Sequence, residues 1–284
     1  MSLLTHERTA TQLMDFRAAP SHAVLLVGPR GSGKRSLAEE LAEWVLDIEA
    51  GRLGEYAYQT RIVPDEGKAI GIEAIRDLSH FLSLKVPGTA GYNRVVIIED
   101  GQLLTIEAQN ALLKMLEEPP VGTILIMTAT NGQAVLPTVR SRMQLIEVLT
   151  ADRQQIAAYF SERGFAADEV KRIAALSGGL PGLMTSLLEQ ADHPLRAATD
   201  MARQLLSQSV YERLLAVDEL SKQRGLLSDT LFILQQMAHV SLQSATGASA
   251  RKWQSVLESS YQASEALAGS GQPKLILTNL LLSL

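Results

Sequence analysis

A short glycine-rich segment near the start of the chain has the residue types needed to hold a phosphate group. It reads G-P-R-G-S-G-K from Gly28 to Lys34 and directly follows the apolar run Ala23–Val27. Glycines let backbone N–H groups turn inward around phosphate oxygens, and the lysine adds a full positive charge. A chance glycine-rich turn is the alternative, but apolar residues at helical spacing follow, which is the strand–loop–helix context of a P-loop. We therefore expect Gly28, Gly31, Gly33 and Lys34 to bind the phosphates of ATP or ADP.

The two positions after the lysine indicate whether the loop can coordinate a metal ion beside the phosphates. A P-loop normally has Ser or Thr directly after the lysine, because that hydroxyl coordinates Mg²⁺. This chain has Arg35 there, which cannot coordinate a cation, and Ser36 comes one position late and points to another side of the helix. Both remain candidate nucleotide contacts. Arg35 could itself reach a phosphate, which would stabilise bound nucleotide and disfavour Mg²⁺-assisted hydrolysis.

A second apolar strand ends in two acids. Val95–Ile98 is followed by Glu99 and Asp100, the pattern of a Walker B strand, whose first acid holds Mg²⁺ and whose second orients the attacking water. The usual order is Asp then Glu, and here it is inverted. Asp100 is one methylene shorter than the usual base, so its carboxylate would lie about 1 Å short, which costs a large factor in rate. Taken alone, these acids are explained equally well as the polar end of an ordinary core strand. The presence of the P-loop favours the Walker B interpretation.

Two further segments carry a resemblance to a known family. The first, E-A-Q-N-A-L-L-K-M-L-E-E-P-P, covers Glu107–Pro120, and the second, L-P-T-V-R-S-R-M, covers Leu136–Met143. They resemble the signature segment and the "SRC" motif of AAA+ clamp loaders. Gly71–Leu78 and Phe81–Lys85 are similar to a segment of the δ′ subunits of bacterial clamp loaders. The resemblance covers most of the chain and is densest within residues 28–142.

The resemblance implies roles for three residues. Asn131 falls at the sensor 1 position, where a polar side chain holds the attacking water. Arg142 falls at the position of the arginine finger, a residue that acts in trans on the ATP of a neighbouring subunit, and Ser141 precedes it in the motif. Met143 replaces the usual cysteine, which should not affect the finger. An arginine outside such a motif would be interpreted as an ordinary surface residue.

Departures from the family separate its motor subunits from its non-motor subunits. The motor subunits, γ/τ in bacteria, carry a sensor 2 arginine where this chain has Pro181. Together with Arg35 and the inverted acids, this compromises three elements of the chain's own site while the finger is kept, a combination that resembles δ′. The chain has no cysteines, so the four-cysteine zinc module of many clamp-loader subunits is missing from Ala50–Gln59, and we expect neither zinc nor another bound metal.

The elements around these motifs predict three domains. Residues 1–149 are expected to form an α/β P-loop (AAA+) domain with a parallel sheet covered on both faces, because short apolar strands alternate with helices. Thr150 is expected to cap the first of three helices of a small helical lid domain over 150–193. Asp192–Pro194 reads as a linker to an all-α collar, or oligomerisation, domain over 194–284. The predicted strands are Ala23–Val27, Arg61–Val63, Val95–Ile98 and Thr123–Ala129.

Composition limits the classes of function. The 284 residues carry a formal net charge of -5, so the chain is not expected to be the main DNA-binding surface of a complex. The five histidines lack metal-ligand spacing. The N-terminus lacks the apolar core of a signal peptide, and no apolar run approaches the length of a membrane span. We expect a cytoplasmic location and no membrane partner.

The resemblance implies a non-motor δ′-type subunit of the DNA polymerase III clamp loader. In a ring with γ/τ and δ, Arg142 would reach the ATP site of a motor subunit, and this chain alone would have little or no ATPase activity. The complex would load the β sliding clamp onto primed DNA. Two alternatives stay open: an active motor subunit of γ/τ type, since Lys34, Asn131 and two acids are present, and a P-loop kinase or other small-molecule phosphotransferase.

Overall fold

The computed structural model of the protein describes residues 4–65, 68–86, 91–188, 194–243, 245–268 and 271–284. The chain divides into two compact units, Met1–Ala151 and Asp152–Leu284. Each unit has its own hydrophobic core: the first has one core on each face of a sheet, and the second has a core formed between helices.

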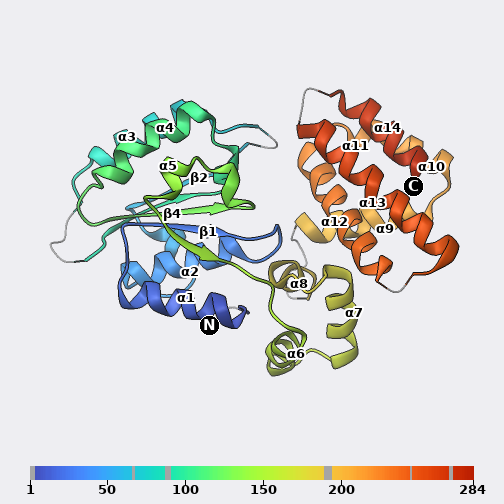
Figure 1. The fold of residues 1–284 in the computed structure, drawn as a ribbon, viewed down its shortest axis with the longest axis horizontal. Coiled ribbons are helices and arrows are strands. Elements are labelled where there is room, and N and C mark those ends of the chain that lie inside the picture. Colours follow the sequence, from blue (N-terminus) through green and yellow to red (C-terminus); the bar gives the residue numbers. More distant parts are fainter. Residues whose placement is uncertain (1–3, 66–67, 87–90, 189–193, 244, 269–270) are drawn as a thin grey trace. The chain divides into compact units, whose positions relative to one another are not determined.

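The first unit is built on a five-stranded parallel sheet (Figure 1) with the strand order β2-β3-β4-β1-β5. This confirms the predicted parallel sheet. The prediction missed β5, because Gln144 and Glu147 interrupt its apolar pattern, and it placed β2 too late. The strands are β1 (Ala23–Val27), β2 (Gln59–Ile62), β3 (Arg94–Ile98), β4 (Thr123–Ala129) and β5 (Gln144–Glu147).

Helices cover both faces of this sheet (Figure 1). Alternate residues of each strand point to opposite faces, so Leu25 and Val96 belong to one core, and Val24 and Ile97 belong to the other. The first core packs against α3 (Ile72–Ser83), α4 (Ile106–Glu117) and α5 (Pro137–Arg140). The second packs against α1 (Glu7–Ala18) and α2 (Lys34–Leu46). Short 3-10 turns lie at η1 (Leu53–Glu55), η2 (Gly101–Leu103) and η3 (Gly132–Ala134).

The described residues of the second unit form helices, with no strand among them. Helix α6 begins after Asp152 rather than at Thr150, so the predicted cap was wrong. Asp152 forms a capping box with Gln155, and these reciprocal hydrogen bonds outweigh a threonine two residues earlier. The helices are α6 (Arg153–Glu162), α7 (Ala167–Ser177), α8 (Pro181–Leu188), α9 (Pro194–Ser207), α10 (Val210–Leu215), α11 (Val217–Leu220), α12 (Arg224–Leu242), α13 (Gly247–Ala268) and α14 (Pro273–Ser283).

The core of the second unit joins α8, the last helix expected for the lid, to the helices expected for the collar. Leu183 of α8 belongs to the same buried cluster as Leu205 of α9 and Leu234 of α12. The apolar stripe that the sequence indicated along α12 supplies much of this core. Residues 192 and 193 of the expected linker lie outside the described residues, so the division into lid and collar domains stays a prediction. In the ranges that the structure describes, none of the helices combines the length and apolarity that crossing a membrane requires.

Candidate phosphate-binding site and arginine finger

The loop Gly28–Lys34 has glycines at positions whose backbone conformation or surroundings disfavour a side chain. Gly31 and Gly33 have φ values of 78° and 86°, in the left-handed region that favours glycine. Gly28 has no room for a side chain, because a Cβ there would lie 2.3 Å from the carbonyl oxygen of Val148. Helix α2 begins at Lys34, so the unpaired N–H groups of its first turn lie next to the loop.

The ammonium group of Lys34 lies within this loop. Its Nζ donates hydrogen bonds of 2.8 Å to the carbonyl oxygens of Gly28 and Pro29. Burial lowers the Lys34 pKa from 10.5 to about 8, an effect that Asp100 partly opposes and Arg30 reinforces. Burial therefore brings the pKa of Lys34 close to neutral pH. A bound phosphate anion would favour the charged form of the lysine.

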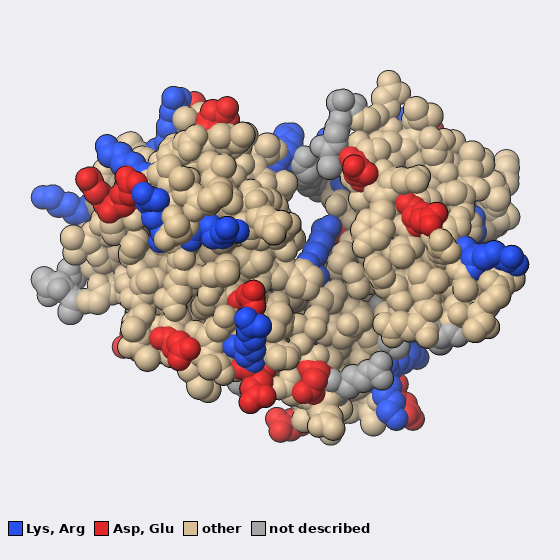
Figure 2. All heavy atoms as spheres, in the orientation of Figure 1, with Lys and Arg blue, Asp and Glu red and all other residues tan. Residues whose placement is uncertain are grey.

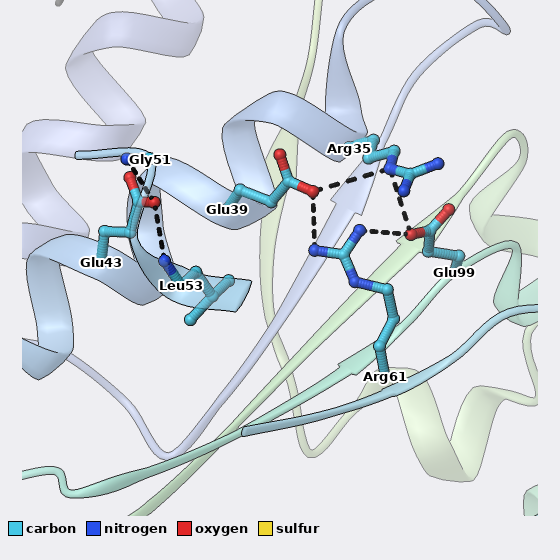
Figure 3. A network of polar contacts seen from close by, with 7 residues as sticks. All are labelled: Arg35, Glu39, Glu43, Gly51, Leu53, Arg61 and Glu99. Carbon is cyan, nitrogen blue, oxygen red and sulfur yellow. Dashed lines mark hydrogen bonds and ion pairs between the residues drawn. The ribbon is translucent and has the colours of Figure 1, made fainter. Parts of the chain in front are cut away.

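Arg35 belongs to a closed set of ion pairs (Figure 3). Its Nε lies 3.6 Å from Oε1 of Glu39 and 3.5 Å from Oε1 of Glu99. Arg61 of β2 contacts the same two carboxylates, with Nη2 2.6 Å from Glu39 and Nη1 2.9 Å from Glu99. Two arginines and two glutamates thus alternate and join α2, β2 and the end of β3. We call these four residues the charge cluster.

Glu99 is the more enclosed acid of this cluster. Its side chain is 12% exposed, against 36% for Glu39, and the side chain of Arg61 beside it is 20% exposed. A carboxylate that is withdrawn from water needs a compensating charge. Here that charge comes from two guanidinium groups, at the position where the sequence predicted a magnesium-binding acid.

These residues do not fit Mg²⁺. The cation demands near-octahedral oxygen ligands and repels cationic neighbours. Arg35 stands where the hydroxyl ligand is needed, and the Oε1 atom of Glu99 is already shared by two arginines. Among the described residues, no group of three or more His, Asp or Glu side chains is arranged to hold a metal ion.

Asp100 lies at the end of β3 and links it to the end of β4. It has a φ of 51°, and its Oδ1 accepts a 2.9 Å hydrogen bond from Nε2 of Gln102. Oε1 of Gln102 accepts a 3.0 Å hydrogen bond from the N–H of Thr130, and the N–H of Asp100 donates to Oγ1 of Thr128 at 3.1 Å. Asp100 is thus oriented by its neighbours and not by the charge cluster.

Asn131 follows β4 at the same edge of the sheet, where the carboxyl ends of β3, β4 and β1 meet. Ligands of open α/β sheets bind at such an edge. Its side-chain Oδ1 accepts a 2.8 Å hydrogen bond from the N–H of Gln133 and so caps η3. The structure therefore places the P-loop, both acids and Asn131 at one edge of the sheet, while Ser36 is exposed on α2.

Arg142 lies just after α5, and its contacts come from α4 and α5. Its Nη2 is 2.8 Å from Oε1 of Glu117, and its Nη1 donates a 2.9 Å hydrogen bond to the carbonyl oxygen of Thr138. Ser141 lies beside it, with its Oγ 3.4 Å from the Arg142 Nη1. The Arg142 side chain is 37% exposed, so its guanidinium is accessible on the surface.

Sequence reasoning missed residues that position these groups. Gln109 of α4 is buried, donates to the carbonyl oxygen of Leu104 at 3.1 Å and accepts from the N–H of Leu136 at 2.7 Å. It therefore fastens the segment that leads to Arg142. Glu39 and Arg61 were also missed. The spacing of Arg35 and Glu39, four residues apart on a helix, was a signal for one ion pair, but nothing local identified Arg61.

Residues 11–152, half of the 284-residue chain, match the family model described as DNA polymerase III, delta subunit. The chain belongs to this family. It is 33% identical over 216 residues to DNA polymerase III subunit delta′ of Pseudomonas aeruginosa, which is 68% of this chain and 64% of that protein. The chain thus spans less than two thirds of the length of that relative. This membership disfavours the phosphotransferase alternative.

The family member also resembles two gamma-type proteins. It is 30% identical over 190 residues to DNA polymerase III subunit gamma/tau of Mycobacterium tuberculosis, covering 60% of this chain and 32% of that protein. The crystal structure of a DNA polymerase III gamma subunit-related protein from Thermotoga maritima superposes with a TM-score of 0.57 at 19% identity, over 97% of this chain and 98% of the other. The structural match shows a shared fold.

Proposed function

We propose that this family member is a non-motor, δ′-type subunit of the DNA polymerase III clamp loader and supplies Arg142 in trans to the ATP site of a neighbouring subunit. The contrast between two sites carries the proposal. The chain's own P-loop has Arg35 at the metal position and a Glu99 that is paired with arginines. Arg142, in contrast, is accessible and placed by residues of α4 and α5.

An arginine in this role acts by charge. Negative charge develops on the γ-phosphate oxygens in the transition state of ATP hydrolysis, and a guanidinium that reaches them can form two hydrogen bonds there. In comparable nucleotide hydrolases, such a residue accelerates hydrolysis by about 10³- to 10⁵-fold. Arg142 would leave Glu117 and Thr138 for the phosphate of the neighbouring subunit, exchanging an exposed ion pair for a buried one.

The proposed partners are γ/τ- and δ-type subunits, with the β sliding clamp and primed DNA reached through the complex in the cytoplasm. The formal net charge of -5 argues that other subunits provide most of the DNA contact. Acidic and basic side chains are interspersed on the face of the molecule that Figure 2 shows, which also suits a subunit that does not grip DNA itself. The helices of the second unit would contribute the oligomerisation collar.

The proposal is tested first on the purified chain. Phosphate release is measured at saturating ATP and Mg²⁺, with the γ/τ-type subunit of the same organism as the positive control. We expect release at least about 100-fold slower than in the motor subunit, because the metal ligand is missing and the base is displaced. Turnover at a rate comparable to the motor subunit would refute the non-motor role.

The active-motor alternative has its own support. Lys34, Asp100 and Asn131 are all present at one edge of the sheet, and the chain is 30% identical to a gamma/tau subunit over 190 residues. The two functions differ in what Lys34→Ala does to an assembled complex. A motor subunit would lose its share of the ATPase activity, whereas a non-motor subunit would leave the activity of the complex unchanged.

A further inference from the structure

The charge cluster lies where a P-loop protein holds its divalent cation. Arg35 occupies the position of the hydroxyl ligand directly after Lys34, and Glu99 occupies the position of the first Walker B acid. In the structure these two residues contact each other, with 3.5 Å between the Arg35 Nε and the Glu99 Oε1. Two positions that supply metal ligands in other P-loop proteins are therefore occupied here by residues that form an ion pair with each other.

Arg61 strengthens the replacement. It approaches Glu99 from β2 at 2.9 Å, closer than Arg35 does, and its side chain is only 20% exposed. The two guanidinium groups bring two positive charges to this acid, as many as one Mg²⁺ carries. Glu39 contacts both arginines and keeps them from repelling each other.

Binding of a divalent cation at this site would be opposed by both arginines. The cation would have to displace two guanidinium groups from Glu99, and a divalent charge beside Arg35 and Arg61 would be repelled by both. Mg²⁺ also gives up its bound water reluctantly and accepts little distortion of its ligands.

We propose that Arg35 and Arg61 are a built-in replacement for the divalent cation of this P-loop, so that the site excludes Mg²⁺ whether or not nucleotide is bound. The cluster then holds the edge strand β2 and the start of α2 against β3 without metal. This inference rests on the proposed function only in regarding residues 28–34 as a P-loop, and it makes no use of Arg142.

The test measures Mn²⁺, a paramagnetic stand-in for Mg²⁺, by the loss of its free signal in electron paramagnetic resonance. The full-length chain is titrated with Mn²⁺ in the absence of ADP and with ADP at the concentration of the chain, and a protein-free titration with the same ADP is subtracted, because ADP itself binds Mn²⁺. The variants are Glu99→Gln, Arg35→Ser, the double variant Arg35→Ser/Arg61→Ala, and this double variant with Glu99→Gln. Arg8→Ser/Arg52→Ala removes the same charge from surface ion pairs and serves as the matched control.

We expect the unchanged chain and the control to retain no Mn²⁺ at a specific site. The double variant should retain about one Mn²⁺ per chain with ADP present, and Glu99→Gln should weaken that binding at least tenfold. Arg35→Ser alone should retain Mn²⁺ more weakly than the double variant and more tightly than the unchanged chain. If circular dichroism shows that the double variant does not fold, the inference is tested on Arg35→Ser alone.

Two results would overturn the inference. One is a Mn²⁺ ion retained by the unchanged chain and lost on Glu99→Gln. The other is a folded double variant that retains no more Mn²⁺ than the unchanged chain, since the arginines would then not be the cause of exclusion. Both are read without turnover, so they are separate from phosphate release by the unchanged chain, which bears on the proposed function.

Discussion

At the scale of single residues, Lys34 and Arg142 show how the same type of charge is used differently in two places. Lys34 is buried against the carbonyl oxygens of its own loop, so its charge is held at the expense of hydration. Arg142 is accessible and balanced by an exposed glutamate, so its charge can be transferred to a partner at little cost. The first arrangement suits a fixed anion site, and the second suits a group that acts on another molecule.

The lowered pKa of Lys34 predicts a pH dependence for nucleotide binding. The free loop has a Lys34 pKa of about 8, and bound phosphate raises that pKa because it favours the ammonium form. Affinity for ADP should therefore be constant below about pH 8 and weaken as the pH rises above it, where the free lysine is neutral. Titration of a fluorescent ADP analogue between pH 7 and 9.5 measures this, and Lys34→Met should abolish the dependence. A wild-type affinity that stays flat across this range would be contrary to the account.

The sequence predicted individual site residues well where the requirement is local. Gly31 and Gly33 were identifiable because the backbone conformation of a P-loop needs glycine at those positions, and the structure gives both a positive φ. Arg61 and Gln109 were not identifiable. Glu99, a partner of Arg61, lies 38 residues away in the chain, and Leu136, a partner of Gln109, lies 27 residues away; such contacts depend on how strands and helices are brought together.

At the scale of elements, the strands β1, β3 and β4 were predicted because they lie inside the sheet, between helices on both faces, whereas the edge strand β2, which is only partly buried, was placed too late. All residues of β3 and β4 are buried, and most of them are apolar, which leaves a mainly apolar run in the sequence. Strand β5 lies at an edge of the sheet and contains polar residues, so its sequence carries no comparable pattern. The cap of α6 was misplaced for a different reason, because the choice between Thr150 and Asp152 depended on a reciprocal partner three residues later.

The charge cluster makes a prediction for the stability of the elements that it joins. Arg61→Ala leaves the partly buried Glu99 with only the longer contact to Arg35. We expect a loss of about 1–3 kcal/mol in the free energy of unfolding, as for a buried acceptor that loses its partner. Arg8→Ala breaks the exposed pair with Glu147 and should cost less than about 1 kcal/mol. Urea unfolding followed by circular dichroism compares the two. Equal losses would mean that the cluster has no special structural role.

Gln109 makes a second prediction at this scale. Gln109→Leu removes both of its hydrogen bonds and leaves the N–H of Leu136 and the carbonyl oxygen of Leu104 without these partners. We expect destabilisation of about 1–3 kcal/mol and a faster amide hydrogen exchange at Leu136. Gln133→Leu, at an exposed position, is the matched control and should change stability by less than about 0.5 kcal/mol. Unchanged protection at Leu136 would show that Gln109 does not fix the segment before Arg142.

At the scale of the whole molecule, the family is shown by the first unit, and the proposed role depends on both units. The family match ends at residue 152, one residue beyond the first unit, so the helical second unit is understood mainly from its fold. That unit was predictable as all-helical from its apolar periodicity. Its division into lid and collar was suggested by the expected linker Asp192–Pro194, whereas α8 of the expected lid shares one core with the helices of the expected collar, a result of packing that spacing alone does not reveal.

The central claim is that Arg142 acts on the ATP of another subunit while the chain's own P-loop does not hydrolyse ATP. The most direct measurement is the ATPase rate of a complex reconstituted with γ/τ- and δ-type subunits, the clamp and primed DNA. Arg142→Ala should lower hydrolysis at the adjoining site by about 10³-fold or more without changing assembly, and Glu117→Gln, which removes only the surface partner of Arg142, should keep the wild-type rate. Full ATPase activity in an assembled Arg142→Ala complex would contradict the account.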